Sequence, residues 1–330
     1  MEETQNKPSI EKDVFIFLDS IKKNPPIYID TYEAARATLS KLQSNQLFLE
    51  DVDRHDYDIP LKNETEIHVR IVRDKNQNYP LPMVFYIHGG GFVMGNAMIY
   101  DTLLRNLAKT VPACFVFAEY SLAPYCKYPT PLNELFEVFE YMFANAEKFN
   151  ISPSHVIFAG DSVGGNMATV LTYLAQKKGY PVEAQFLFYP VTNALMDTSS
   201  YQEFNNGPWL TKEAMEWFIF AYEPDINKRK NPYVSPFFLP DEEVKNMPFT
   251  FILTAENDVL RDEGEAYAKK LLNQGVDVFS IRINGTIHDF LMLEPLSHSF
   301  TTRMSYKLIT DTLKSKILNF AFQDEIKKIK

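Results

Sequence analysis

The sequence predicts an α/β protein in which a mostly parallel central sheet is flanked by helices. Short apolar stretches typical of strands lie at residues 66–72, 83–87, 114–120, 155–160, 184–189, 250–255 and 276–283. Helical stretches separate the later ones, which is the pattern of a sheet covered on both faces. Internal repeats, low-complexity runs and Gly/Ser-rich linkers are absent. We therefore expect one large domain with an added lobe.

Composition narrows the class of protein. The chain has 330 residues, of which 45% are hydrophobic and 14% aromatic, enough for a sizeable core. Its two cysteines, Cys114 and Cys126, lie in apolar or aromatic sequence and do not form a disulfide framework, so we expect a reducing, cytoplasmic compartment. The net charge of −10 disfavours nucleic acid and anionic membranes, whereas neutral small molecules remain suitable partners.

The N-terminal part of the chain predicts helices rather than a membrane anchor. Residues 1–7 are polar, and the apolar block 14–18 is bounded by charges, so no signal peptide or membrane span is expected. Apolar residues recur at helical spacing over 10–21, and a second helix follows Asp30, a candidate N-cap with Glu33 three residues later. Residues 1–50 are therefore expected to form a helical cap segment.

An insertion interrupts the alternation of strands and helices. About sixty residues separate the strand ending at Tyr189 from the strand starting at Thr250, more than a crossover requires. We expect a core of residues 51–190 and 245–330 and a cap insertion of residues 191–244. Within the insertion, Thr211 can cap a helix whose apolar face and neighbours are Trp209, Met215, Trp217, Phe218, Ile219 and Tyr222. This face either packs in the core or forms a hydrophobic lid over an active site.

A candidate nucleophile lies in the Gly-Asp-Ser-Val-Gly sequence at residues 160–164. A serine between two such glycines can occupy a very tight turn from a strand into a helix, which exposes its hydroxyl. The flanks fit, because 155–159 reads as a strand and 166–176 as a helix. Ser162 is therefore a candidate nucleophile, provided that a base, an acid and an oxyanion site lie in compatible places.

Two histidines follow the serine with room for an acid between them. In a wound sheet, ligands bind at the carboxyl ends of strands, so catalytic residues should follow strands closely. His288 comes shortly after the last strand, in a loop where Gly285 allows a turn. His298 lies later, between serines. His288 is the favoured base and His298 the alternative.

The acid is expected after the strand at residues 250–255. Asp258 follows that strand after a short turn, and it is the favoured candidate. Glu256 lies nearer the strand, and Asp262 lies one helical turn further along. Both remain alternatives.

A glycine run at residues 88–92, His-Gly-Gly-Gly-Phe, follows the strand at 83–87. Three glycines allow the backbone to approach a substrate and to direct its N–H groups at one point. The run lacks the lysine of a P-loop and the spacing of a dinucleotide site. It is better explained as an oxyanion hole, completed by the N–H of Val163 after the nucleophile.

In combination, these motifs resemble the hormone-sensitive-lipase-like (family IV) esterases of the α/β-hydrolase fold. The resemblance rests on residues 88–92, 120–124, 160–166 and 258–264, and it extends over roughly residues 80–295. It implies a triad of Ser162, Asp258 and His288, in the chain order of this fold. It also implies a cap made from the N-terminal and inserted helices, and activity on short- to medium-chain acyl esters. The oxyanion hole would comprise Gly90, Gly91 and Val163.

Two departures from the family pattern concern structure rather than chemistry. The family commonly has proline where this chain has Val259, and arginine where it has Ser121. The first change loosens a turn and the second removes an ion pair. His88, which is unchanged, is expected to brace its loop rather than to act as the base.

The function predicted is that of a serine carboxylesterase working through an acyl-enzyme intermediate, without metal or cofactor. The alternatives are a small-amide hydrolase or deacetylase with the same triad, and a non-catalytic receptor with the hydrolase fold. Because His288 must be neutral to act as base, activity should rise at about pH 6 to 7. Asp161, beside the serine, is expected to brace the turn.

A homodimer is a further expectation. The last strand, 276–283, should lie at a sheet edge with apolar residues along it, so a second copy could pair there. The alternative is coverage by the C-terminal helix that contains Ile309, Leu313 and Ile317.

Overall fold

The computed structural model describes residues 9–44 and 49–329, with side chains described up to residue 319. The expectation that residues 1–7 contain no signal peptide lies outside this range, as do parts of the segment 1–50. Within the described residues, no helix combines the length and the apolar character needed to cross a membrane.

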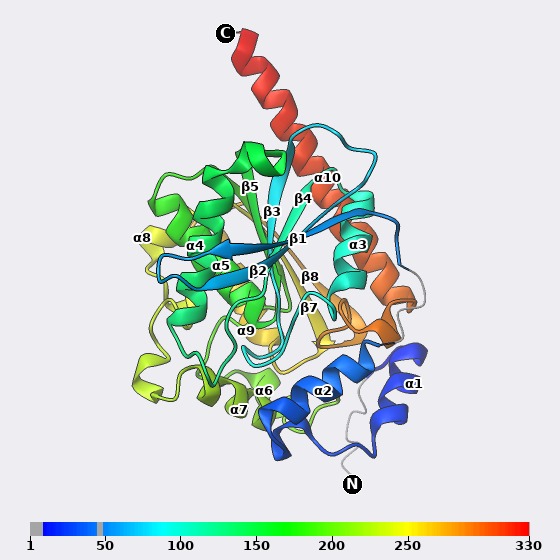
Figure 1. Ribbon diagram of the computed structural model, residues 1–330. Helices are drawn as coiled ribbons and strands as arrows, with labels where there is room; N and C mark the ends of the chain where they lie inside the picture. Colours follow the sequence, from blue (N-terminus) through cyan, green and yellow to red (C-terminus); the bar gives the residue numbers. More distant parts are fainter. Residues whose placement is uncertain (1–8, 45–48, 330) are drawn as a thin grey trace.

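The described residues form one eight-stranded sheet flanked by helices (Figure 1). Its strands are β1 (Asp53–Pro60), β2 (Glu66–Arg73), β3 (Leu81–Ile87), β4 (Cys114–Ala118), β5 (Ile151–Asp161), β6 (Val182–Phe188), β7 (Phe249–Asn257) and β8 (Val278–Ile287). Their order is β1-β2-β4-β3-β5-β6-β7-β8. The pairs β1·β2 and β2·β4 are antiparallel and all other pairs are parallel, so the predicted mostly parallel sheet is confirmed.

The helices cover both faces and one end of the sheet. They are α1 (Lys12–Ile21), α2 (Tyr32–Leu42), α3 (Asp101–Thr110), α4 (Thr130–Ala144), α5 (Val163–Lys177), α6 (Ser199–Glu203), α7 (Lys212–Tyr222), α8 (Asp241–Val244), α9 (Arg261–Asn273) and α10 (Phe300–Ile329), with 3₁₀ turns η1 (Ile27–Ile29), η2 (Ala146–Phe149), η3 (Ile226–Lys228), η4 (Pro236–Phe238) and η5 (Glu294–Leu296). Helices α3 and α10 pack together on one face, and α4 and α5 on the other (Figure 1). Helices α1, α2, α6 and α7 gather at one end of the sheet.

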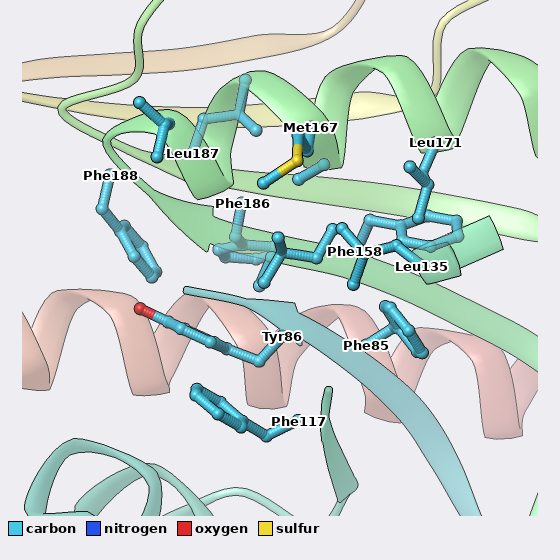
Figure 2. Close-up of a cluster of buried hydrophobic side chains, with 14 of the residues drawn as sticks. Phe85, Tyr86, Phe117, Leu135, Phe158, Met167, Leu171, Phe186, Leu187 and Phe188 are labelled. Atoms are coloured by element: carbon cyan, nitrogen blue, oxygen red, sulfur yellow. The ribbon is translucent and has the colours of Figure 1, made fainter. Parts of the chain in front are cut away.

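The core forms because the central strands are apolar on both faces. Every residue of β4 is buried, and β3, β5 and β6 are buried over most of their length. Figure 2 shows Phe85, Phe158 and Phe186 from three adjacent strands, with Met167 and Leu171 of α5 packed nearby. Full burial of such side chains contributes about 1.5–3 kcal/mol each. This core holds the strand ends, and therefore the loops that follow them, in fixed positions.

Two strands differ from the sequence prediction. Strand β1 was not predicted, because this antiparallel edge strand is mostly exposed and carries polar residues instead of an apolar run. Strand β8 continues past the predicted end to Ile287, so the residues around Gly285 are strand and not a loop. A register irregularity between Ala255 and Asn257 of β7 accommodates the extra length.

Strand β8 lies at the sheet edge, as expected, but part of that edge is covered. Helices α1 and α10 both pack against β8. At its carboxyl end, the carbonyl of Gly285 accepts a hydrogen bond from the N–H of Glu11 at 2.8 Å. Only the earlier part of β8 is therefore placed for pairing with another strand.

Candidate active site

Ser162 lies on the turn between β5 and α5. Its φ of 55° and ψ of −122° are strained for a residue with a side chain, as expected of a nucleophile elbow. The glycine two residues later permits the turn, because a Cβ on Gly164 would lie 2.1 Å from the carbonyl oxygen of Ile87. The chain therefore reverses against β3 and turns the serine hydroxyl toward the carboxyl ends of the strands.

His288 and Asp258 meet Ser162 at this edge of the sheet. His288 follows β8 directly, and Asp258 follows β7. Nε2 of His288 lies 2.9 Å from Oγ of Ser162, and Nδ1 lies 2.7 Å from Oδ2 of Asp258. The other carboxylate oxygen of Asp258 accepts the N–H of Leu260 at 3.0 Å, which orients the carboxylate. The structure thus brings the three residues of the predicted triad into one hydrogen-bonded chain.

The surroundings of His288 favour its protonated form. Burial by itself lowers the pKa of the imidazole, but the charges of Asp258 and Asp289 outweigh it and raise the pKa to about 9. The expected onset of activity at about pH 6 to 7 assumed an unperturbed histidine. The structure instead places the neutral, basic form of His288 at higher pH.

The predicted oxyanion loop lies opposite the elbow. Gly90 and Gly91 have φ values of +89° and +64°, and a Cβ on Gly91 would lie 2.2 Å from the ring of Phe218. In the described part of the chain, the N–H groups of Gly90, Gly91 and Val163 donate to no backbone carbonyl outside regular elements and to no side chain. Val163 is also the first residue of α5, where helix N–H groups lack intrahelical partners. These N–H groups can therefore stabilise a negative oxygen at the serine.

Asp161 braces the elbow against the oxyanion loop. Its carboxyl group accepts hydrogen bonds from the hydroxyls of Tyr86 at 2.9 Å and Tyr100 at 2.7 Å, and from the N–H of Gly89 at 3.1 Å. Burial raises its pKa to about 7 in spite of these donors. Asp161 makes no hydrogen bond to Ser162 or His288 among these contacts, which fits the expected bracing role.

His88 also supports this loop. Its ring stacks on that of Tyr120, with centroids 4.1 Å apart, and its Nδ1 lies 2.9 Å from the carbonyl oxygen of Gly89. Burial lowers the pKa of His88 to about 4, so the ring is neutral at physiological pH.

The alternative base and acids lie elsewhere. His298 lines a polar cavity beside α3 and α10. Glu256 accepts the N–H of Gly285 at 2.7 Å, and Asp262 accepts the N–H of Ser200 at 2.8 Å. Neither carboxylate is the partner of the imidazole Nδ1.

A largely apolar cavity of about 460 Å³ opens at Ser162 and His288. Its wall comes from both segments predicted to form the cap. Leu18 and Leu39 of the N-terminal helices line the cavity. Trp209, Met215 and Phe218 line it from the insertion. Tyr32 of α2 stacks on Trp217 of α7 with ring centroids 4.3 Å apart, which joins the two segments.

Sequence reasoning missed the polar residues that connect these segments to the site. Nε of Arg36 donates to the carbonyl of Val93 at 2.7 Å, and Gln43 donates to the carbonyl of Met292 at 2.6 Å. Asp289, next to the imidazole, was also missed. Gln43 lies next to the buried face of an amphipathic helix. A polar residue at such a position is the sequence signal that could have revealed this connection.

Comparison with known proteins identifies the family. Residues 84–292 match the family model described as the α/β-hydrolase fold. The chain belongs to that family, in its hormone-sensitive-lipase-like branch. It is 41% identical over 299 residues to a protein of Acanthamoeba polyphaga mimivirus named as an α/β hydrolase, covering 90% of this chain and 86% of the relative.

Two further relatives of this α/β hydrolase bear more specific names. The carboxylesterase NlhH of Mycobacterium tuberculosis is 31% identical, over 84% of this chain and 87% of the relative. The crystal structure of a thermostable esterase from Pseudomonas putida is similar with a TM-score of 0.91 and 34% identity, covering 94% of this chain and 98% of that one. The α/β hydrolase described here is a carboxylic ester hydrolase.

Proposed function

We propose that this hydrolase is a serine carboxylesterase in which Ser162 is the nucleophile, His288 the general base and Asp258 the residue that orients the imidazole. The observation that carries the proposal is the hydrogen-bonded chain through Nε2 and Nδ1 of His288, at 2.9 Å and 2.7 Å. Ser162, at one end of these hydrogen bonds, lines the cavity that can receive an ester.

In the acylation step, Nε2 of His288 takes the proton of the Ser162 hydroxyl while Oγ attacks the ester carbonyl carbon. The tetrahedral intermediate collapses when the imidazolium gives that proton to the leaving alkoxide, releasing the alcohol and leaving an acyl-serine. A water molecule then attacks the acyl carbon while losing a proton to His288, and the imidazolium returns that proton to Oγ of Ser162 as the acid is released. Asp258 stabilises the imidazolium in both steps.

The oxyanion of each intermediate would be bound by the N–H groups of Gly90, Gly91 and Val163. Each such donor lowers the barrier by on the order of 3 kcal/mol, because it is already oriented before charge develops. The fixed backbone of the loop, braced by Asp161 and His88, supports this role.

The substrate we propose is an uncharged ester with a short- to medium-chain acyl group. The walls of the cavity are mostly apolar, with polar side chains such as Lys22, Asn24 and Asn206 among them. Residues 1–50 and 191–244 would form the cap that shapes it, over a core of residues 51–190 and 245–330. The stacking of Tyr32 on Trp217 supports the assignment of both segments to one cap.

Hydrolysis of p-nitrophenyl esters of increasing acyl length, with one p-nitroanilide included, tests the proposal. We expect the highest kcat/KM at short to medium length, and a fall of about a millionfold in kcat for Ser162→Ala. A fluorophosphonate probe should label the wild type and not this variant. Undiminished activity in Ser162→Ala would contradict the role of the serine. A preference for the anilide would indicate an amidase. Failure of the probe to label Ser162 in the wild type would indicate a receptor.

A further inference from the structure

Asp289 places a second carboxylate beside the imidazole of His288. Its Oδ1 lies 3.3 Å from Nε2 of His288, and its Oδ2 accepts the indole N–H of Trp209 at 2.9 Å. The side chain is only 20% exposed and lines the cavity. Asp289 therefore joins the cap insertion, through Trp209, to the nitrogen that exchanges protons with Ser162.

The position of this carboxylate matters because Nε2 changes role during the reaction. When His288 is neutral, its proton lies on Nδ1 beside Asp258, and the lone pair of Nε2 must accept the serine proton. A carboxylate oxygen at 3.3 Å repels that lone pair but attracts the N–H of the imidazolium. The imidazole therefore lies between Asp258 and Asp289, and both favour its charged form.

Within the described residues, the charged groups that act most strongly on His288 are anionic. The charged groups acting on His288 are Asp258, Asp289 and, from the end of β5, Asp161. The ring of Tyr189, after β6, meets the imidazole edge to face at 4.8 Å. Burial and the charges of Asp161 and Asp289 raise the pKa of Tyr100 and of Tyr189. The cap contributes Lys22 and Tyr28 to the same cavity, and Lys22 pairs with Asp19 at 2.5 Å.

We propose that Asp289 is a positioning residue and charge filter for the ester hydrolysis: it favours protonated His288 in the free enzyme and disfavours leaving alcohols that carry a negative charge. The inference rests on the proposed function. Both effects follow from the 3.3 Å between Oδ1 of Asp289 and Nε2 of His288. Because Nε2 protonates the leaving oxygen, the leaving alcohol must also come close to Asp289. An anionic alcohol part would meet a carboxylate of the same charge, whereas a hydroxyl or ammonium group would find an acceptor there.

The replacement Asp289→Asn isolates the charge. Asparagine tolerates the φ of +64° at this position and keeps an oxygen that can accept the Trp209 N–H. The acid limb of the kcat/KM profile should move down by about 1 pH unit, because one nearby anion is removed. The plateau at high pH should fall several-fold, because a weaker base accepts the proton less readily. The profiles of variant and wild type should therefore cross.

Asp277→Asn is the matched control, because Asp277 is exposed and immediately precedes the opposite end of β8. Its profile should coincide with that of the wild type. A uniform loss of activity in Asp289→Asn, without movement of the acid limb, would overturn the proposal. Should Asp289→Asn fail to fold, Asp289→Gly removes the same charge at a backbone conformation that glycine favours.

Charge selectivity provides the second readout. The ratio of kcat/KM for phenyl butyrate to that for 4-carboxyphenyl butyrate should be high in the wild type and several-fold lower in Asp289→Asn. An unchanged ratio contradicts the charge filter.

A titration of His288 by NMR is independent of turnover. With ¹³C-labelled histidine and the His288 signal assigned from a His288→Gln spectrum, the pKa of His288 should be lower in Asp289→Asn than in the wild type. Equal values would overturn the inference even if the esterase is active. If Ser162→Ala were to retain activity, the function proposed above would fail while this titration still reported on the carboxylate.

Discussion

The side-chain amide of Gln43, at the C-terminal end of α2, donates a hydrogen bond to the backbone carbonyl of Met292 at 2.6 Å. The same nitrogen donates to the carbonyl of Ile99 at 3.0 Å, and its oxygen accepts the N–H of Glu294 at 2.8 Å. Gln43 is buried. One side chain therefore fixes the end of a cap helix to the loop that follows His288.

Loss of this amide should destabilise the protein. Gln43→Ala leaves two buried carbonyls and one N–H without their partner, so we expect the free energy of unfolding to fall by about 2–4 kcal/mol. Urea denaturation measures the change. Lys41→Ala, at an exposed position on the same helix, should change it by less than about 0.5 kcal/mol. Equal effects of the two replacements would show that the hydrogen bonds of Gln43 add nothing to stability.

Gly91→Ala tests the oxyanion loop. The new Cβ would lie 2.2 Å from the ring of Phe218, at a φ of +64°, so the loop must move. We expect kcat/KM to fall by about 10²- to 10³-fold, the effect of losing one oxyanion donor. Ester hydrolysis at wild-type rates would mean that the N–H of this residue is not used.

Gly275→Ala separates backbone strain from loss of the donor. Gly275 has a similarly positive φ of +80°, but no atom lies within 4 Å of an added Cβ. This variant should lose about 1 kcal/mol of stability and keep its activity. A comparable loss of activity in both glycine variants would point to a general effect of strain.

The elements found from sequence share a local signature. The strands β3 to β7 are apolar runs, and the elbow at Ser162 is bounded by glycines that the turn requires, so both were predictable. Strand β1 was missed because an exposed edge strand needs no apolar run. Its identity depends on pairing with β2, which no local pattern records.

The residues of the site also fall into those that a local sequence pattern reveals and those that it does not. Asp258 and His288 each follow a strand closely, so a rule about strand ends finds them. Asp289 was missed although it is adjacent to His288, because its importance depends on the direction of its side chain toward Nε2 and Trp209. The pKa of His288 depends on burial, which lowers it, and on the charges of Asp258, Asp289 and Asp161, which raise it, and the fold alone brings these effects together.

A dimer through the edge strand β8 stays a prediction. Phe279 is 41% exposed on this strand, and the pairing surface before Gly285 is not covered by the bond from Glu11. Light scattering at micromolar concentration should give twice the mass of the chain, and Arg282→Pro should lower it by interrupting strand pairing. A monomeric mass for the wild type would exclude the dimer, leaving α10 and α1 as the cover of this edge.

Arg36 should influence catalysis although it lies on the cap helix α2. Its Nε donates to the carbonyl of Val93 at 2.7 Å, and a terminal nitrogen donates to the carbonyl of Ala123 at 3.1 Å. The N–H of Val93 in turn donates to the carbonyl of Gly90 at 3.1 Å, so the guanidinium holds the segment that presents the oxyanion donors. In Arg36→Met a shorter, unbranched apolar side chain replaces the arginine, so both hydrogen bonds are lost. We expect kcat to fall about tenfold, since small displacements of oriented groups are costly to the barrier.

Arg36→Lys distinguishes the geometry from the charge. Lysine keeps the positive charge but lacks the planar fork that reaches two carbonyls, so it should recover only part of the lost kcat. Steady-state kinetics with one p-nitrophenyl ester compares the three proteins. If Arg36→Lys equalled the wild type, charge alone would suffice. If the kcat of Arg36→Met equalled that of the wild type, the oxyanion loop would keep its shape without the hydrogen bonds from the cap helix.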